Sequence, residues 1–200
     1  FVALHEAYRC SGQRLAMVGE AVASDSTSAA LLPWEEVRDW FHLAGNYVDS
    51  IDRAAEALAM RLGGNSPTTD AIETHLKQAL SISLIYSGAA GLRSFDAEMG
   101  HLTIDPGQPA ESRRFQLAHQ LAALALKDEI AAVVEQAALK SAASRQLLFV
   151  GLCNYAAGAL LMPYRRFRAE ARAVRHDIDR LAQAFATSFE QACHRLSTLQ

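Results

Sequence analysis

The chain has 200 residues, of which 50% are hydrophobic and 20% are charged, and its formal net charge is −3. A chain of this length can bury a substantial core, and its mild acidity argues against nucleic-acid binding by these residues themselves. No apolar run reaches the roughly 18 residues that cross a bilayer. The three cysteines, an odd number at wide spacing, form neither a disulfide framework nor a CxxC metal motif. We therefore expect a cytoplasmic protein with reduced thiols and no membrane partner and, since the chain starts at Phe1, flanking segments beyond it.

Two helical segments are predicted before residue 64, at 1–23 and from Pro33 onward, with a polar linker at 24–28 between them. In the second segment apolar residues recur in steps of three and four, which is typical of a long helix with a coiled-coil-like seam. These positions are Trp34, Val37, Phe41, Ala44, Val48, Ile51, Ala55, Leu58 and Leu62. The helix would be about 45 Å long, and it indicates either a dimer seam or a hairpin with residues 1–23. We take residues 1–64 as a helical arm that supports a homodimer.

Residues 65–200 are predicted to form a second unit with an α+β fold, mostly helical with a small sheet of about three short strands. Asp70 is the expected N-cap of a helix that reaches about residue 80. Short β-rich segments follow at 81–87, 92–97 and 101–105, separated by glycines. Helices are expected from about 111, at 128–139, at 142–161 and from Pro163 to about 175. Two more follow, with Asp177 as one N-cap and a capping box at the start of the other.

The stretch "RRFQLAHQLAALAL" at 113–126 has the frame of a zinc-protease helix without its ligands. Such a helix needs His-Glu-x-x-His, with two imidazoles on one face and a glutamate to polarise the water. Here His119 is followed by Gln120, which cannot act as a general base, and by Ala123, which is no ligand. We therefore expect no metal and no enzymatic activity. The alternative is a residual metallopeptidase that recruits ligands from elsewhere, such as His101 or Asp105.

Two motifs in order resemble those of the ImmA/IrrE-type metallopeptidases: "RRFQLAHQLA" at 113–122 and "LCNYAAGALLMPYRRF" at 152–167. In the second motif Val150 stands where the family has a ligating glutamate. Together with "LPWEEVRDWFHLAGNYVDSIDRAAEALA" at 32–59 and the segment 177–200, they resemble the central domain of the short-chain fatty acyl transcriptional regulators, the RamB/PrpR-like members of the XRE family.

The resemblance implies a zincin-like core that has lost its metal site and that senses a ligand, acyl-CoA or CoA. It also implies DNA binding only through a helix-turn-helix N-terminal to this chain. An iron–sulfur cluster is implied only for a region C-terminal to it.

A CoA thioester needs several Arg or Lys donors for its phosphates and an apolar pocket for its acyl group. The space freed by the missing zinc ligands is the expected pocket, and each candidate has a structural alternative: a solvated helix face or salt bridge for an arginine, a core position for the histidine or tyrosine. The candidate ligand-binding residues are Arg61, Arg93, Arg113, His119, Tyr155, Arg165, Arg175 and Arg195. We expect a ligand-sensing and dimerisation domain of a transcriptional regulator of short-chain fatty acid, acetate or propionate metabolism. The alternatives are the residual peptidase and a purely structural dimerisation module.

Overall fold

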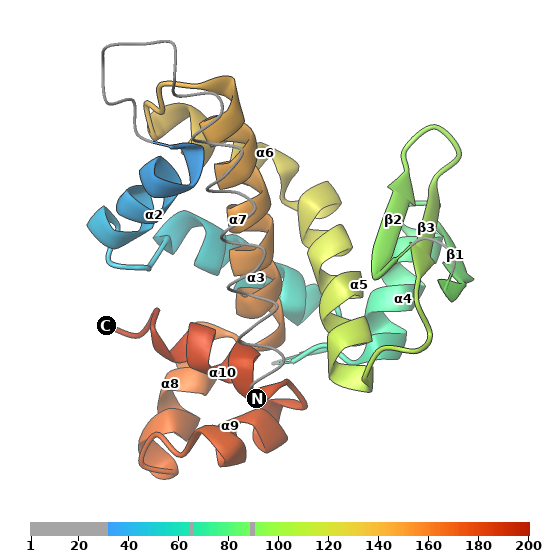
Figure 1. The fold of residues 1–200 in the computed structure, drawn as a ribbon. Helices are drawn as coiled ribbons and strands as arrows, with labels where there is room; N and C mark the ends of the chain where they lie inside the picture. The colour runs from blue at the N-terminus through green and yellow to red at the C-terminus, as the bar shows by residue number, and fades with distance from the viewer. Residues whose placement is uncertain (1–31, 65, 89–90) are drawn as a thin grey trace.

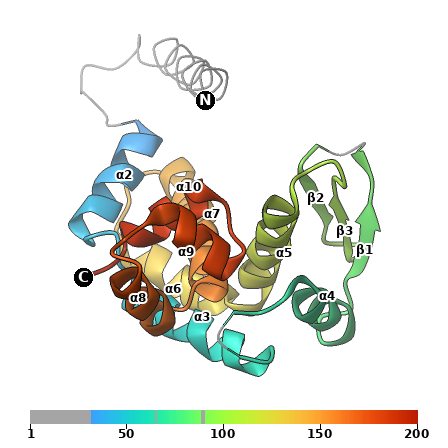
Figure 2. The ribbon, with the colours of Figure 1, turned by 90° about the horizontal axis from the view of Figure 1, so that it is seen from below.

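The computed structural model describes residues 32–64, 66–88 and 91–200 (Figure 1). The helix predicted at residues 1–23 lies outside this part of the chain. In the described part, helices surround one central helix, α7, and a small sheet lies at one side of the molecule (Figures 1 and 2). This arrangement confirms the predicted α+β class, mostly helical with three short strands.

The long helix predicted from Pro33 to Leu62 is wrong, because the chain forms two helices there. Helix α2 covers Pro33–Leu43 and α3 covers Asp49–Arg61. Between them Gly45 and Asn46 adopt positive φ angles of 62° and 55°, and the amide of Asn46 donates to the carbonyl of Phe41. This left-handed turn ends α2. The apolar spacing continues through the break because the same side of both helices meets the same neighbour.

That neighbour is α7, which packs against both α2 and α3. Val37, Ile51, Ala55 and Leu58 are buried within the chain in one hydrophobic cluster with residues of α5 and α7. We call this cluster the main core. Most of the apolar positions that suggested a dimer seam face the interior of the same chain, so intramolecular packing explains the periodicity there. Trp34, the first of them, is 42% exposed.

The sheet follows helix α4, Thr69–Gln78, whose N-cap is Thr68 and not the predicted Asp70. Its strands are β1 Ser83–Tyr86, β2 Arg93–Asp96 and β3 His101–Ile104, as expected from the β-rich segments. The order is β1-β3-β2, with β1 parallel and β2 antiparallel to β3. The central strand β3 contributes Leu102 and Ile104 to the main core.

Helix α5, Ala110–Ala125, lies between the sheet and α7 (Figure 1). It is followed by α6, Lys127–Gln136, and by α7, Ala142–Leu161. Because α7 packs against α2, α3, α5, α6 and α10, it is apolar on most of its surface. The degenerate zinc-protease motif is therefore carried by a helix held between a sheet and the central helix of the main core.

The last three helices are α8 Tyr164–Ala173, α9 Ile178–Phe185 and α10 Phe189–Leu196. Both predicted caps are confirmed: Asp177 accepts from the amide of Arg180, and Ser188 forms a capping box with Gln191. Met162, Phe167, Leu181, Phe185 and Ala192 form a separate small hydrophobic cluster, here called the C-terminal cluster. In the described residues no single helix has the length and hydropathy to span a membrane; only α7 and α8 taken together, across a bend of 64°, reach them.

Two Gly→Ala substitutions should change stability in opposite directions. At Gly45, with φ +62°, a Cβ would lie 3.2 Å from Nε2 of Gln200, so Gly45→Ala should destabilise the chain by about 1–2 kcal/mol. At Gly158, inside α7, a Cβ meets nothing within 4 Å, so Gly158→Ala should stabilise it by about 0.5–1 kcal/mol. Urea unfolding of both variants measures the difference, and equal effects would contradict the assigned turn between α2 and α3.

Candidate functional site

Helix α5 places His119 at the junction of the sheet, α5 and α7. Its side chain is 7% exposed, and Nη1 of Arg93, from β2, donates a hydrogen bond to Nδ1 of the imidazole. Because an arginine can only donate, Nδ1 is the acceptor and the neutral ring carries its proton on Nε2. Burial, together with the charge of Arg93, lowers the pKa of His119 to about 4. The histidine is thus neutral near pH 7 and is bound to a cation of the protein itself.

Cys153 of α7 completes the surroundings of the Arg93 guanidinium. Burial raises the pKa of this thiol to about 11, although the charge of Arg93 opposes the shift. Burial also lowers the pKa of Arg93. In the described chain, no ion pair links Arg93 to an aspartate or glutamate. We call Arg93, His119 and Cys153 the Arg93 cluster.

The residues of this cluster do not fit a metal ion. A zinc site needs three or four N, O or S ligands, and a positive guanidinium already binds Nδ1 of the only histidine of the motif. Gln120 stands at the position of the general base, which does not bind the zinc, and Ala123 and Val150 have no side-chain atom that could bind it. Among the residues that the structure describes, no group of three His, Cys, Asp or Glu side chains is placed to hold a metal. Asp105, one of the alternative ligands, accepts a hydrogen bond from the amide of Gly107 at 2.8 Å.

A cavity of about 560 Å³ lies between α2, α5, α7 and α10. It is called the main cavity here. Phe115, on its α5 wall, precedes His119 by one helical turn, and Arg93, His119 and Cys153 are not among the residues that line the cavity. Its apolar lining includes Phe41, Phe115 and Met162, and its polar lining includes Ser112, Asn154, Tyr155, Gln191, His194 and Arg195. Apolar walls with a few polar groups are typical of small-molecule sites of this size.

Two predicted residues, Tyr155 and Arg195, meet at this cavity in a buried network centred on Asp52 of α3. Nη2 and Nη1 of Arg195 donate to the two carboxylate oxygens of Asp52 at 2.5 and 3.1 Å, and the Tyr155 hydroxyl donates to the same carboxylate. Tyr155 also accepts from the amide of Val48 at 3.0 Å. Nε of Arg195 donates to the carbonyl of Met162 at 2.9 Å. Burial alone would lower the pKa of Arg195, but the hydrogen bond and charge of Asp52 raise it.

The other predicted arginines do not converge on the main cavity. Arg113 donates to the carbonyls of Pro106 and Gln108, in the loop before α5. Arg165 lines a separate cavity of about 340 Å³ with Tyr47 and Tyr164. Arg61 and Arg175 are exposed at the end of α3 and in the turn after α8. The structure therefore brings together Arg93 with His119 and Tyr155 with Arg195, and among the predicted arginines Arg195 alone lines the main cavity.

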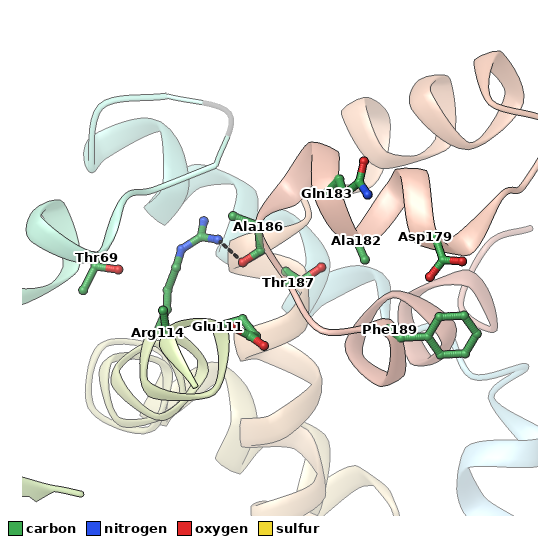
Figure 3. Close-up of a pocket in the computed structure, with 10 residues that line it drawn as sticks. Thr69, Glu111, Arg114, Asp179, Ala182, Gln183, Ala186, Thr187 and Phe189 are labelled. Carbon is green, nitrogen blue, oxygen red and sulfur yellow. Dashed lines mark hydrogen bonds between the residues drawn. The ribbon is translucent and has the colours of Figure 1, made fainter. Parts of the chain in front are cut away.

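Two site residues, Asp52 and Arg114, were not foreseen in these roles from the sequence. Arg114 is buried and donates to the carbonyls of Pro67, Phe185 and Ala186 and to the Ser66 hydroxyl. It lines a cavity of about 410 Å³ between α4, α5, α9 and α10. Figure 3 shows its side chain among the residues of this lining. For Asp52 the signal was present, because it falls on the apolar side of α3 with Val48, Ala55 and Ala59, where an acid needs a buried cation. The partners of Arg114 could not be predicted from the local sequence, because they lie 47 to 72 residues away.

Breaking the buried ion pair should be far more costly than breaking an exposed one. Asp52 and Arg195 are 2% and 3% exposed, so Asp52→Asn should lower the free energy of unfolding by about 3–5 kcal/mol. The exposed pair Arg53–Asp49 on the same helix is the matched control, and Asp49→Asn should change it by less than about 1 kcal/mol. Denaturant unfolding of both variants measures this, and similar losses would contradict a structural role specific to Asp52.

His119 should make the chain less stable in mild acid. An unfolded histidine titrates near 6.5, whereas folded His119 titrates near 4, so between these values only the unfolded state takes up this proton. Stability is therefore lost as the pH falls, by about 2 kcal/mol between pH 7 and pH 5. Neither Arg93 nor Cys153, with its raised pKa, titrates in this range.

The variant His119→Asn keeps an acceptor for Arg93 but cannot titrate, so it should lose this part of the pH dependence. Urea unfolding at pH 7 and pH 5 measures it. His194→Asn is the control, because it makes the same substitution at an exposed position of α10. A wild-type slope in His119→Asn would refute the neutral, buried imidazole.

Over its full length the chain is 42% identical to the "Propionyl-CoA carboxylase regulator" of Cereibacter sphaeroides. It is 33% and 34% identical to the "HTH-type transcriptional regulator PrpR" and "HTH-type transcriptional regulator RamB" of Mycobacterium tuberculosis. It covers 43%, 42% and 43% of the lengths of these three relatives.

A solved structure and a family match agree with these relatives. The structure of a "Mycobacterium tuberculosis transcriptional regulator" superposes with a TM-score of 0.81 at 34% identity, over 85% of this chain and 53% of that one. Residues 85–197, which include β2, the degenerate motif of α5 and all of α7 to α10, match the peptidase M78 family, described as the IrrE N-terminal-like domain. The chain therefore belongs to the IrrE N-terminal-like domain family, and its relatives include proteins named as transcriptional regulators.

Proposed function

We propose that this chain is the ligand-sensing part of a transcriptional regulator of short-chain fatty acid metabolism, and that its effector is an acyl-CoA or CoA bound in the main cavity. The relatives are named as regulators, and one is named for propionyl-CoA carboxylase, an enzyme whose substrate is a short-chain acyl-CoA. The observation that carries the proposal is the main cavity itself, which lies beside a zincin-like helix whose set of metal ligands is incomplete.

The lining of the main cavity suits the acyl-pantetheine end of such a ligand. Phe41, Phe115 and Met162 offer apolar surface to a short acyl chain. Asn154 and Gln191 each carry an amide that both donates and accepts, which matches the amide groups of pantetheine. A volume of about 560 Å³ lies within the range of small-molecule sites. The nucleotide end lies outside the main cavity in this proposal, since the described arginines do not gather there.

The position of the cavity supports a sensing mechanism. Its α5 and α7 walls belong to the main core, whereas Met162 belongs to the C-terminal cluster, and α10 supplies the facing wall. A ligand that contacts both sides binds best to the one arrangement of α10 relative to α7 that fits it. Binding then shifts the population toward that arrangement by the difference in affinity. We propose that segments outside this chain read the shift and that DNA is bound only by them.

No catalytic role is proposed. Hydrolysis by a zincin-like site needs ligands and a general base, and Gln120, Ala123 and Val150 supply neither. The homodimer stays a prediction, now without the argument from the apolar spacing of α2 and α3. Size-exclusion chromatography with light scattering tests it directly.

Filling the main cavity should abolish ligand binding while the chain stays folded. Gly158 lines the cavity, and no heavy atom lies within 4 Å of a Cβ built there, so the ring of Gly158→Phe should occupy the ligand's place. Calorimetric titration with propionyl-CoA should show binding to the wild type and at least about tenfold weaker binding to Gly158→Phe. Ala132→Phe, on the exposed side of α6, is the matched control and should bind like the wild type.

Circular dichroism melting curves establish that both phenylalanine variants are folded. Unchanged affinity in Gly158→Phe would place the ligand elsewhere. Absence of binding of acetyl-CoA, propionyl-CoA and free CoA at millimolar concentration would refute the proposed effector.

A further inference from the structure

We propose that Arg93 is a fixed internal cation in the place where a zinc-protease helix would hold its metal, and that it binds a carboxylate group of the ligand. The proposal rests on the proposed function, because the ligand reaches Arg93 through the main cavity. It adds a chemical class: a short acid, either free or as the monothioester of a dicarboxylic acid.

The register of the sheet determines where the side chain of Arg93 points. In the antiparallel pair, Arg93 is opposite Ile104, and Phe95 is opposite Leu102. Side chains opposite one another lie on the same face, and Ile104 and Leu102 are fully buried. Arg93 therefore extends over the inner face of the sheet toward α5, where it donates to His119. A guanidinium positioned from an edge strand thus meets the one histidine that remains of the motif.

The charge of Arg93 is less satisfied than that of the two other buried arginines in the described chain. Arg195 has both oxygens of Asp52, and Arg114 donates to three carbonyls and a hydroxyl. Arg93 has a hydrogen bond to a neutral imidazole, which uses one of its five N–H groups, and no ion pair with a described carboxylate. A partly buried cation of this kind is stabilised by an incoming anion. The planar fork of a guanidinium matches a carboxylate in particular.

The main cavity and the Arg93 cluster use neighbouring turns of the same two helices, α5 and α7. On α7, Val150 is 40% exposed and Asn154 is exposed, and they flank the buried Cys153 near Arg93. On α5, Phe115 of the main cavity lies one turn from His119. An acyl chain that enters the cavity along Phe115 and Asn154 therefore leads its far end toward Arg93. A terminal carboxylate at that end would meet the guanidinium, whereas a terminal methyl would leave it without an anion.

The test compares ligands of equal length that differ at this end. Butyryl-CoA and succinyl-CoA carry four-carbon acyl groups that end in a methyl and a carboxylate. Titrations should show succinyl-CoA binding at least about tenfold more tightly than butyryl-CoA, since charge-assisted hydrogen bonds are roughly twice as strong as neutral ones. Arg93→Gln should remove this preference, and Arg93→Lys should restore part of it. Arg168→Gln, at an exposed position of α8, is the control and should keep the full preference.

Free succinate and butyrate form a second arm that distinguishes the two sources of the carboxylate. Binding of a free acid that depends on Arg93, without binding of any thioester, would support the role of Arg93 and refute the CoA effector. Binding of butyryl-CoA without any preference for succinyl-CoA would overturn the role of Arg93 and leave the proposed function standing. Equal loss of both thioesters in Arg93→Gln, with an unchanged melting temperature, would also overturn it. If no thioester and no free acid binds, both proposals are wrong.

Discussion

The arrangement of the candidate site depends on one buried ion pair, between Asp52 of α3 and Arg195 of α10, which are 143 residues apart. Tyr155 of α7 donates to the same carboxylate, so three helices meet at one charge. A buried ion pair adds little net stability, because the desolvation of both ions offsets their attraction. It does penalise every alternative arrangement in which either charge stays buried alone. Its effect is therefore to specify where α10 sits against α3 and α7, and with it the shape of the main cavity.

A second buried arginine, Arg114 of α5, binds the end of α9. Arg114 donates to the carbonyl of Phe185, at the end of α9. It also donates to the carbonyl of Ala186, the C-cap of α9 (Figure 3). The last carbonyls of a helix have no intrahelical partner and carry partial negative charge, so a cation is well placed there. The C-terminal cluster is small, and these polar contacts supplement its apolar ones. Arg114 thus contacts the end of α9, and Arg195 lies on α10. Arg114 lines the cavity of about 410 Å³, Arg195 lines the main cavity, and α10 contributes to both linings.

Local signals explain what could be predicted from the sequence. The strands and the helices after residue 110 lie close to their predicted positions, because glycines, prolines and the caps at Asp177 and Ser188 act within a few residues. The helix break at Gly45 was missed because steps of three and four count only which residues face inward. The same spacing results when a turn separates two helices that both pack against α7. The roles of the arginines were less predictable still, since Arg113, Arg114 and Arg195 are distinguished only by partners supplied through the fold.

In the Arg93 cluster, the histidine of a zincin-like helix has a hydrogen-bond partner from the protein itself, Arg93. A buried imidazole nitrogen that accepts a hydrogen bond needs a donor, and in a catalytic zincin the metal meets that need at the ligating nitrogens. Here Ala123 and Val150 remove two ligand positions outright, so their places need no partner. The nitrogen that remains, Nδ1 of His119, has Arg93 as its donor, and burial keeps the ring neutral so that the two do not repel. The positive charge of the site is thus supplied by a side chain that cannot dissociate from the protein. Such a charge can orient an anion, but it lacks the open coordination positions with which a bound metal activates water.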